Sequence, residues 1–138
     1  MKRLRAIFVL VAVVGSLLAA CGTAEPKVYN DPSQIISVKV GQEFIISLVD
    51  RSASTGYIWN KEFDNSFLAL VEDKYKEPEK VTSPMLGAPG TRVLKFKALK
   101  KGKTELTLVN RPAWWERIPP DEQQKIEVDK KVFTVNIN

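Results

Sequence analysis

Seven short runs along the chain have the composition of β-strands. They cover residues 36–40, 44–48, 57–59, 68–76, 92–99, 104–109 and 132–137. The alternation of apolar and polar residues is clearest where Leu94, Phe96 and Ala98 share one face and where Phe133, Val135 and Ile137 do. Successive side chains of a strand point to opposite faces, so this period of two predicts strands with one buried and one exposed face.

Turn residues separate these runs. Gly41 and Gln42 lie between the first two runs, and Lys-Lys-Gly-Lys at 100–103 lies between the fifth and the sixth, so we expect two β-hairpins here. Prolines fall outside the runs, because proline cannot donate to a ladder. Beyond residue 20, no apolar repeat of three and four residues indicates a long amphipathic helix. The pattern therefore predicts an all-β domain over residues 35–138, an immunoglobulin-like β-sandwich of about seven strands.

The N-terminal segment has the layout of a secretory signal. Lys2, Arg3 and Arg5 form a basic head, and an apolar run over 6–20 follows it. That run is shorter than the about 20 residues that a helix needs to cross a bilayer. We therefore expect residues 1–20 to be a cleaved signal peptide rather than a membrane-spanning helix.

The single cysteine of the chain follows this segment directly. Leu-Ala-Ala-Cys at 18–21 resembles the lipobox of bacterial lipoproteins, in which the cysteine is acylated and becomes the new N-terminus. A chance cysteine beside an ordinary cleavage site is the alternative. Because Cys21 cannot form an internal disulfide, lipidation is the favoured use of its thiol. We expect residues 21–34 to be a lipidated cysteine and its tether, anchored to a membrane of the cell envelope: the outer membrane facing the periplasm, or a Gram-positive cell surface.

Composition narrows the classes of function. The formal net charge of +5 falls to +2 when Lys2, Arg3 and Arg5 leave with the signal, and this small excess does not indicate nucleic-acid binding. Histidine is absent and Cys21 is committed to lipid, which excludes Ser-His, Cys-His and His-ligated zinc sites. We expect no enzyme, no cofactor and no metal site. Acidic residues among the loop lysines leave a carboxylate-dependent hydrolase as a remote alternative.

Unusual residues collect in three loops. Ser-Ala-Ser-Thr-Gly-Tyr stands at 52–57, Leu-Gly-Ala-Pro-Gly-Thr at 86–91 and Arg-Pro-Ala-Trp-Trp-Glu at 111–116. In an immunoglobulin-like sandwich the loops between strands two and three, four and five, and six and seven can gather at one end. The alternative is that the glycines only form turns and the two tryptophans pack on the domain's own edge. We expect Trp59, which continues a strand, to lie in the core.

In this order and spacing the loops resemble those of the chagasin family of cysteine-protease inhibitors. The family's loops read Asn-Pro-Thr-Thr-Gly-Tyr, a glycine-rich stretch with Pro-Gly, and Arg-Pro-Trp. The similarity extends over about residues 36–137 and includes Tyr57, Trp59 and Gly102. It implies a reversible, competitive inhibitor of papain-like cysteine proteases, whose three loops enter the active-site cleft without reacting. The implied protease-binding residues are Ser54, Thr55, Gly56, Tyr57, Gly87, Ala88, Pro89, Gly90, Arg111, Pro112, Trp114 and Trp115.

Two departures from the family pattern bear on the inhibitory loops. Ser52 and Ala53 replace Asn-Pro, which removes a stiffening ring and predicts a looser first loop. Ala113 is inserted before the tryptophans, so either Trp114 or Trp115 takes the family tryptophan's position. We favour Trp115, because the family often continues with glutamate, as Glu116 does here.

An alternative function keeps the same fold. The chain could be an envelope interaction module whose loops bind another protein, such as another hydrolase or an assembly factor. The altered first loop is the feature that keeps this alternative open. Nothing in the sequence requires an oligomer, and we expect a monomer.

Overall fold

The computed structural model describes residues 25–78 and 88–138 of the chain. The expected signal peptide, Cys21 and Gly87 therefore lie outside the described residues. The strands are β1 Lys27–Tyr29, β2 Ile36–Val38, β3 Glu43–Asp50, β4 Tyr57–Phe63, β5 Leu68–Lys76, β6 Gly90–Ala98, β7 Gly102–Pro112 and β8 Asp129–Ile137. Three short helical turns are α1 Ser52–Thr55, η1 Trp115–Arg117 and α2 Pro120–Gln123.

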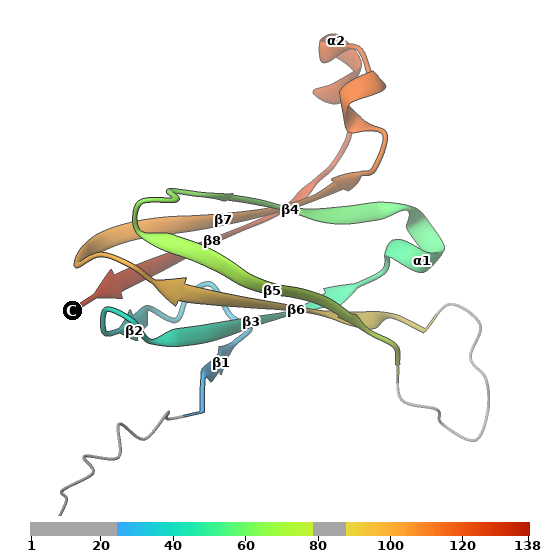
Figure 1. The fold of residues 1–138 in the computed structure, drawn as a ribbon. Helices are drawn as coiled ribbons and strands as arrows, with labels where there is room; N and C mark the ends of the chain where they lie inside the picture. The colour runs from blue at the N-terminus through green and yellow to red at the C-terminus, as the bar shows by residue number, and fades with distance from the viewer. Residues whose placement is uncertain (1–24, 79–87) are drawn as a thin grey trace, which may run out of the picture.

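The strands form two four-stranded sheets that pack face to face (Figure 1). One sheet has the order β1-β3-β6-β5 and the other has the order β2-β8-β7-β4. The β1–β3 and β2–β8 pairs are parallel, and the remaining pairs are antiparallel. The predicted all-β sandwich is confirmed. No helix within the described segments is long and apolar enough to span a bilayer.

Both predicted hairpins are wrong, although their strands exist. β2 and β3 belong to different sheets, and so do β6 and β7. The turn residues instead connect one sheet to the other, and the two connections meet: Gly41 N donates to Ala98 O at 2.8 Å, and Ala98 N donates to Gln42 O at 2.9 Å. Alternation determines which face of a strand is buried, and both sheets bury that face. It does not determine which strand lies alongside.

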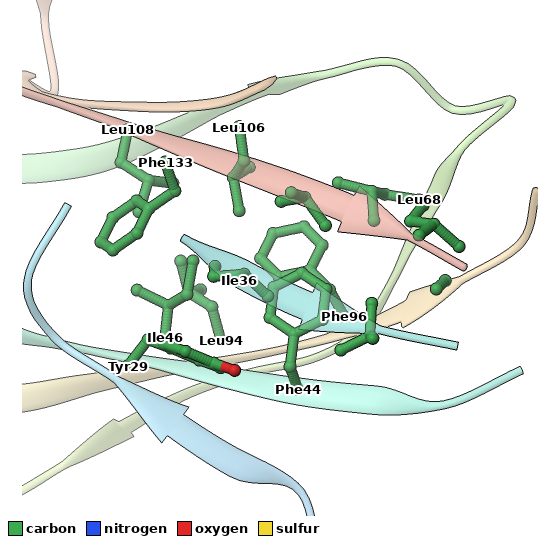
Figure 2. Packing of buried hydrophobic residues seen from close by; sticks show 14 of the residues in the cluster. Tyr29, Ile36, Phe44, Ile46, Leu68, Leu94, Phe96, Leu106, Leu108 and Phe133 are labelled. Atoms are coloured by element: carbon green, nitrogen blue, oxygen red, sulfur yellow. The ribbon is translucent and has the colours of Figure 1, made fainter. Parts of the chain in front are cut away.

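The core between the sheets is built from the predicted apolar faces. Phe44 and Phe96 stack with ring centroids 5.6 Å apart (Figure 2). Phe63 meets Phe96 edge-on with ring centroids 5.2 Å apart. Trp59 is 6% exposed, and its indole Nε1 donates to the Val49 carbonyl at 3.0 Å. The burial predicted for Trp59, for alternate residues of β6 and for alternate residues of β8 is therefore confirmed.

The ordered domain begins earlier than expected. Residues 27–29, which we placed in the tether, form β1 alongside residues 44–46 of β3. Tyr29 is 3% exposed and packs edge-on against Phe44 at 6.4 Å. A strand of three residues has too short an alternation to be distinguished from a tether by sequence, and burial of the Tyr29 ring is what attaches it.

Candidate functional site

Strands β3, β5 and β7 all end at the same end of the sandwich, so the connections that follow them begin there (Figure 1). Asp50, the last residue of β3, lies opposite Gly90, the first residue of β6. Tyr57, the first residue of β4, lies opposite Pro112, the last residue of β7. The first and third loops are therefore adjacent, and the exit of the second loop lies beside the start of the first.

The first loop is a single helical turn, α1, rather than an irregular loop. Gly56 N donates to Ser52 O at 2.9 Å and closes the turn. The Thr55 hydroxyl donates to the Arg51 carbonyl at 2.8 Å and accepts from Tyr57 N at 3.1 Å. The Ser54 hydroxyl also donates to Arg51 O, at 3.2 Å. These side-chain bonds constrain the turn that contains Ala53, the position where the family has proline.

Gly56 ends the turn, and both its backbone conformation and the small space beside its Cα favour glycine. Its φ of +71° lies in the left-handed region. A Cβ on Gly56 would lie 2.9 Å from Cζ3 of Trp114, closer than real Cβ atoms come to other heavy atoms. The Gly56 carbonyl also accepts a hydrogen bond from Ala113 N at 3.0 Å. The first and third loops are thus joined through Gly56.

Trp114 is the tryptophan that contacts the first loop. Its ring meets Tyr57 edge-on with centroids 6.4 Å apart, yet Trp114 remains 42% exposed. Trp115, which we favoured from sequence, begins η1 and is partly buried. The guanidinium of Arg111 lies 5.4 Å from the centre of the Trp115 ring. The inserted Ala113 therefore gives the two tryptophans different neighbours.

The segment that contains η1 and α2 projects from the end of β7 beyond the sandwich (Figure 1). The Gln123 amide Nε2 donates to Trp115 O at 3.1 Å and to Ile118 O at 2.9 Å, which ties α2 back to η1. Arg111 Nη2 lies 3.4 Å from Glu116 Oε1. These contacts hold Trp115 as part of this projecting segment.

Only part of the second loop is described, and it corrects one prediction. Ala88 and Pro89 precede β6 without regular structure, as expected of a loop. Gly90, which we placed in the exposed loop, is instead buried and paired in the sheet. A Cβ on Gly90 would overlap the ring of Tyr75. Glycine is therefore needed here for close packing within the sheet.

A charge network behind the first loop was missed from sequence. Asp50 is 2% exposed; one carboxylate oxygen accepts from Ser52 N at 2.8 Å and the other from Arg92 Nε at 2.9 Å. Arg92 also bonds Asp73 at 3.1 Å. Burial raises the pKa of Asp50, but the hydrogen bonds from Ser52 and Arg92 outweigh it and hold the pKa below its ordinary 3.8. Asp50 lies two residues after the buried Leu48, on the same face of β3, so the alternation along this strand could have indicated that Asp50 is buried.

Comparisons with known proteins agree with this architecture. The model of the chagasin family of peptidase inhibitors, I42, matches residues 37–128. The structure of the cysteine protease inhibitor EhICP2 from Entamoeba histolytica has a TM-score of 0.61 and 22% identity, covering 83% of this chain and 98% of its own. Amebosin has a TM-score of 0.61 and 18% identity, covering 82% of this chain and 98% of its own. No curated protein gives a significant match.

These two likenesses, at identities below 25%, show a shared fold. The family match is broader evidence, because it extends across well over half of the chain and includes the first loop, the described part of the second and the two tryptophans. The family is one of peptidase inhibitors rather than enzymes. The chain belongs to the chagasin family of peptidase inhibitors.

Proposed function

We propose that this chain is a reversible, competitive inhibitor of papain-like cysteine proteases that inserts its loop end into the active-site cleft. The observation that carries the proposal is the contact of Trp114 with Gly56 and Tyr57, which joins an exposed aromatic ring to an exposed turn. A partly exposed tryptophan beside a constrained backbone turn is typical of the anchor of an interface.

The proposed mechanism is steric and involves no bond making or breaking. The α1 turn would lie nearest the target's catalytic cysteine, with Ser54 and Thr55 exposed on it. Thr55 uses its hydroxyl inside the turn, so its contribution is to hold the backbone rather than to contact the enzyme. Trp114 would fill a pocket on one wall, and the second loop around Ala88 and Pro89 would lie along the other. A turn already constrained in the free protein loses little entropy on binding.

The proposed setting is the cell envelope. Acylation of Cys21 would attach the mature chain to a membrane, on the outer membrane facing the periplasm or on a cell surface. The three residues of β1 enter the sheet at the end of β3 that lies opposite α1, since Lys27 pairs with Phe44 and the parallel strand then runs toward Asp50. An anchor preceding β1 would therefore leave the loop end free.

Titration of papain tests the proposal. The chain from Gly22 onward should raise the KM for a fluorogenic peptide without changing kcat, with an inhibition constant below about 1 μM. Activity should return on dilution, and the inhibitor should remain intact. Absence of inhibition at micromolar concentrations would exclude the proposal and favour the envelope interaction module with another partner.

Truncating the two tryptophans separately should distinguish their roles. We expect Trp114→Ala to weaken inhibition by about 30-fold, the loss of a typical aromatic hot spot. Trp115→Ala is its matched control and should weaken inhibition by less than about 5-fold, because Trp115 is packed within the projecting segment. Inhibition constants and thermal midpoints of both variants provide the measurement. A larger effect at Trp115 would overturn the assignment of Trp114 as the anchor.

A further inference from the structure

The outward face of the β1-β3-β6-β5 sheet carries an aliphatic strip on its β1 and β3 side. Val28 of β1 lies opposite Ile45 of β3, and Val93, which lies opposite the outward Ser47, and Val49 continue the strip toward the loop end. Val28 is 56% exposed and Val49 is 58% exposed. These residues alternate with the buried ones, so their side chains point away from the core. An exposed aliphatic strip is a candidate surface for contact with another apolar body.

The β6 and β5 side of the same face carries lysines. Lys95 and Lys97 of β6 alternate with the buried Leu94 and Phe96, and Lys74 and Lys76 of β5 lie opposite Val93 and Thr91. Among the described residues of β3, β5 and β6, the outward acids are Glu72, 3.4 Å from Lys95, and Glu43, opposite Lys97. The lysines outnumber the acids, so this side of the face is positive.

The outward face of the other sheet has a different composition. Its register places Lys103 and Lys130 beside Glu62 and Glu105 on the outside, together with the neutral polar residues Asn60, Thr107, Thr134 and Asn136. Its charges are of both signs, and its exposed aliphatic residues, Ile58 and Val132, are each 38% exposed, less than Val28 and Val49. Aliphatic residues beside lysines, by contrast, match the boundary between lipid headgroups and acyl chains, where the stems of lysine extend along apolar surface and the ammonium groups meet anionic headgroups.

The position of the proposed anchor places this face near a bilayer. Five residues separate Cys21 from Lys27, a reach of at most about 22 Å. Val28, the first outward residue of the strip, lies within β1 itself. We propose, on the basis of the proposed lipidation of Cys21, that the outward face of the β1-β3-β6-β5 sheet docks on an anionic lipid surface and orients the domain on its membrane.

Lysine footprinting on vesicles tests this orientation. Cys21 is the single cysteine of the chain, so the mature protein can be coupled through its thiol to maleimide lipid in vesicles. Brief acetylation followed by mass spectrometry then reports lysine exposure on phosphatidylcholine vesicles and on vesicles that also contain phosphatidylglycerol. We expect Lys95 and Lys97 to be acetylated at least about 3-fold less on the anionic vesicles, and Lys103 and Lys130 of the opposite sheet to be unchanged.

Matched double variants separate a specific face from general attraction. Lys95→Gln with Lys97→Gln should remove the protection of Lys74 and Lys76, whereas Lys103→Gln with Lys130→Gln should leave it intact. Equal protection of lysines on both sheets, or no difference between the two vesicle types, would overturn the docking face. Chemical coupling makes this result independent of natural acylation. Inhibition of papain in solution should be the same for both double variants, so failure of the docking face is distinct from failure of the inhibitory function.

Discussion

Gly56→Ala is expected to weaken inhibition of papain by about 30-fold, which corresponds to about 2 kcal/mol of binding free energy. Alanine in the left-handed region costs about 1 kcal/mol of folding stability, in the free and the bound protein alike, so this strain does not itself weaken binding. Its Cβ would also lie 2.9 Å from a ring atom of Trp114, so the ring must move. Displacing an anchoring tryptophan costs about 2 kcal/mol of binding free energy. The measurement is the inhibition constant, together with the free energy of unfolding in urea.

Gly41→Ala is a matched control for this change. Gly41 has a similar φ of +87°, but a Cβ there would have no heavy atom within 4 Å. It lies in the connection between β2 and β3, at the end of β3 opposite α1. We expect Gly41→Ala to lose about 1 kcal/mol of stability and no inhibition. Equal inhibition by the two variants would show that the contact between Gly56 and Trp114 does not contribute to binding.

The burial of individual side chains was largely predictable from the sequence, because alternate residues of a strand point toward the core. Leu94, Phe96 and Ala98 follow the period of two, and each is 0% exposed. The partner of each strand was not predictable in this way. Residues 92–99 and 104–109 are separated by a short turn, but the turn crosses between sheets. A sandwich and a hairpin bury the same residues, so the pattern alone could not distinguish them.

The loop end was predictable in position and less so in detail. Family resemblance indicated which three loops gather, and the described residues place the first and third in contact. The closing of 52–55 into a helical turn depends on side-chain bonds of Ser54 and Thr55 to Arg51. The neighbours of Trp114 depend on the inserted Ala113. Both features arise from contacts between adjacent loops, which the order of residues along the chain does not specify.

The buried carboxylate of Asp50 has a structural role that the composition of the chain does not reveal. Asp50 was not among the residues predicted to form the site, yet it is the one charged residue with a fully buried side chain within the described segments. It connects the start of α1, through Ser52 N, to Arg92 near the start of β6. Arg92 in turn bonds Asp73 of β5. The carboxylate therefore positions the first loop relative to the strands that border the second.

Asp50→Asn should destabilise the protein by about 2 kcal/mol at neutral pH, because it leaves Arg92 without its buried counter-ion while nearly preserving side-chain shape. Asn can still accept from Ser52 N through its amide oxygen, but it cannot neutralise the guanidinium. The free energy of unfolding in urea at pH 7 provides the measurement. Asp73→Asn is the control, since Asp73 is the more exposed partner of Arg92, and should cost less than about 1 kcal/mol.

The pH dependence of the difference in unfolding free energy between the parent protein and Asp50→Asn identifies the Asp50 carboxylate as the source of that difference. The pKa of Asp50 is lowered in the folded protein, so its contribution to stability is fully present above 3.8 and is lost as the pH falls through the lower folded value. The gap between the parent protein and Asp50→Asn should therefore be constant from neutral pH to about pH 5 and close only below 3.8. Hydrogen bonds from Ser33 and Ser66 also lower the pKa values of Asp31 and Asp64. In acid, both proteins lose the contributions of these two carboxylates to stability equally, so the gap between them does not change. A gap that persisted unchanged in acid would instead indicate that asparagine disturbs the packing of α1, and that the charge of Asp50 does not hold the loop.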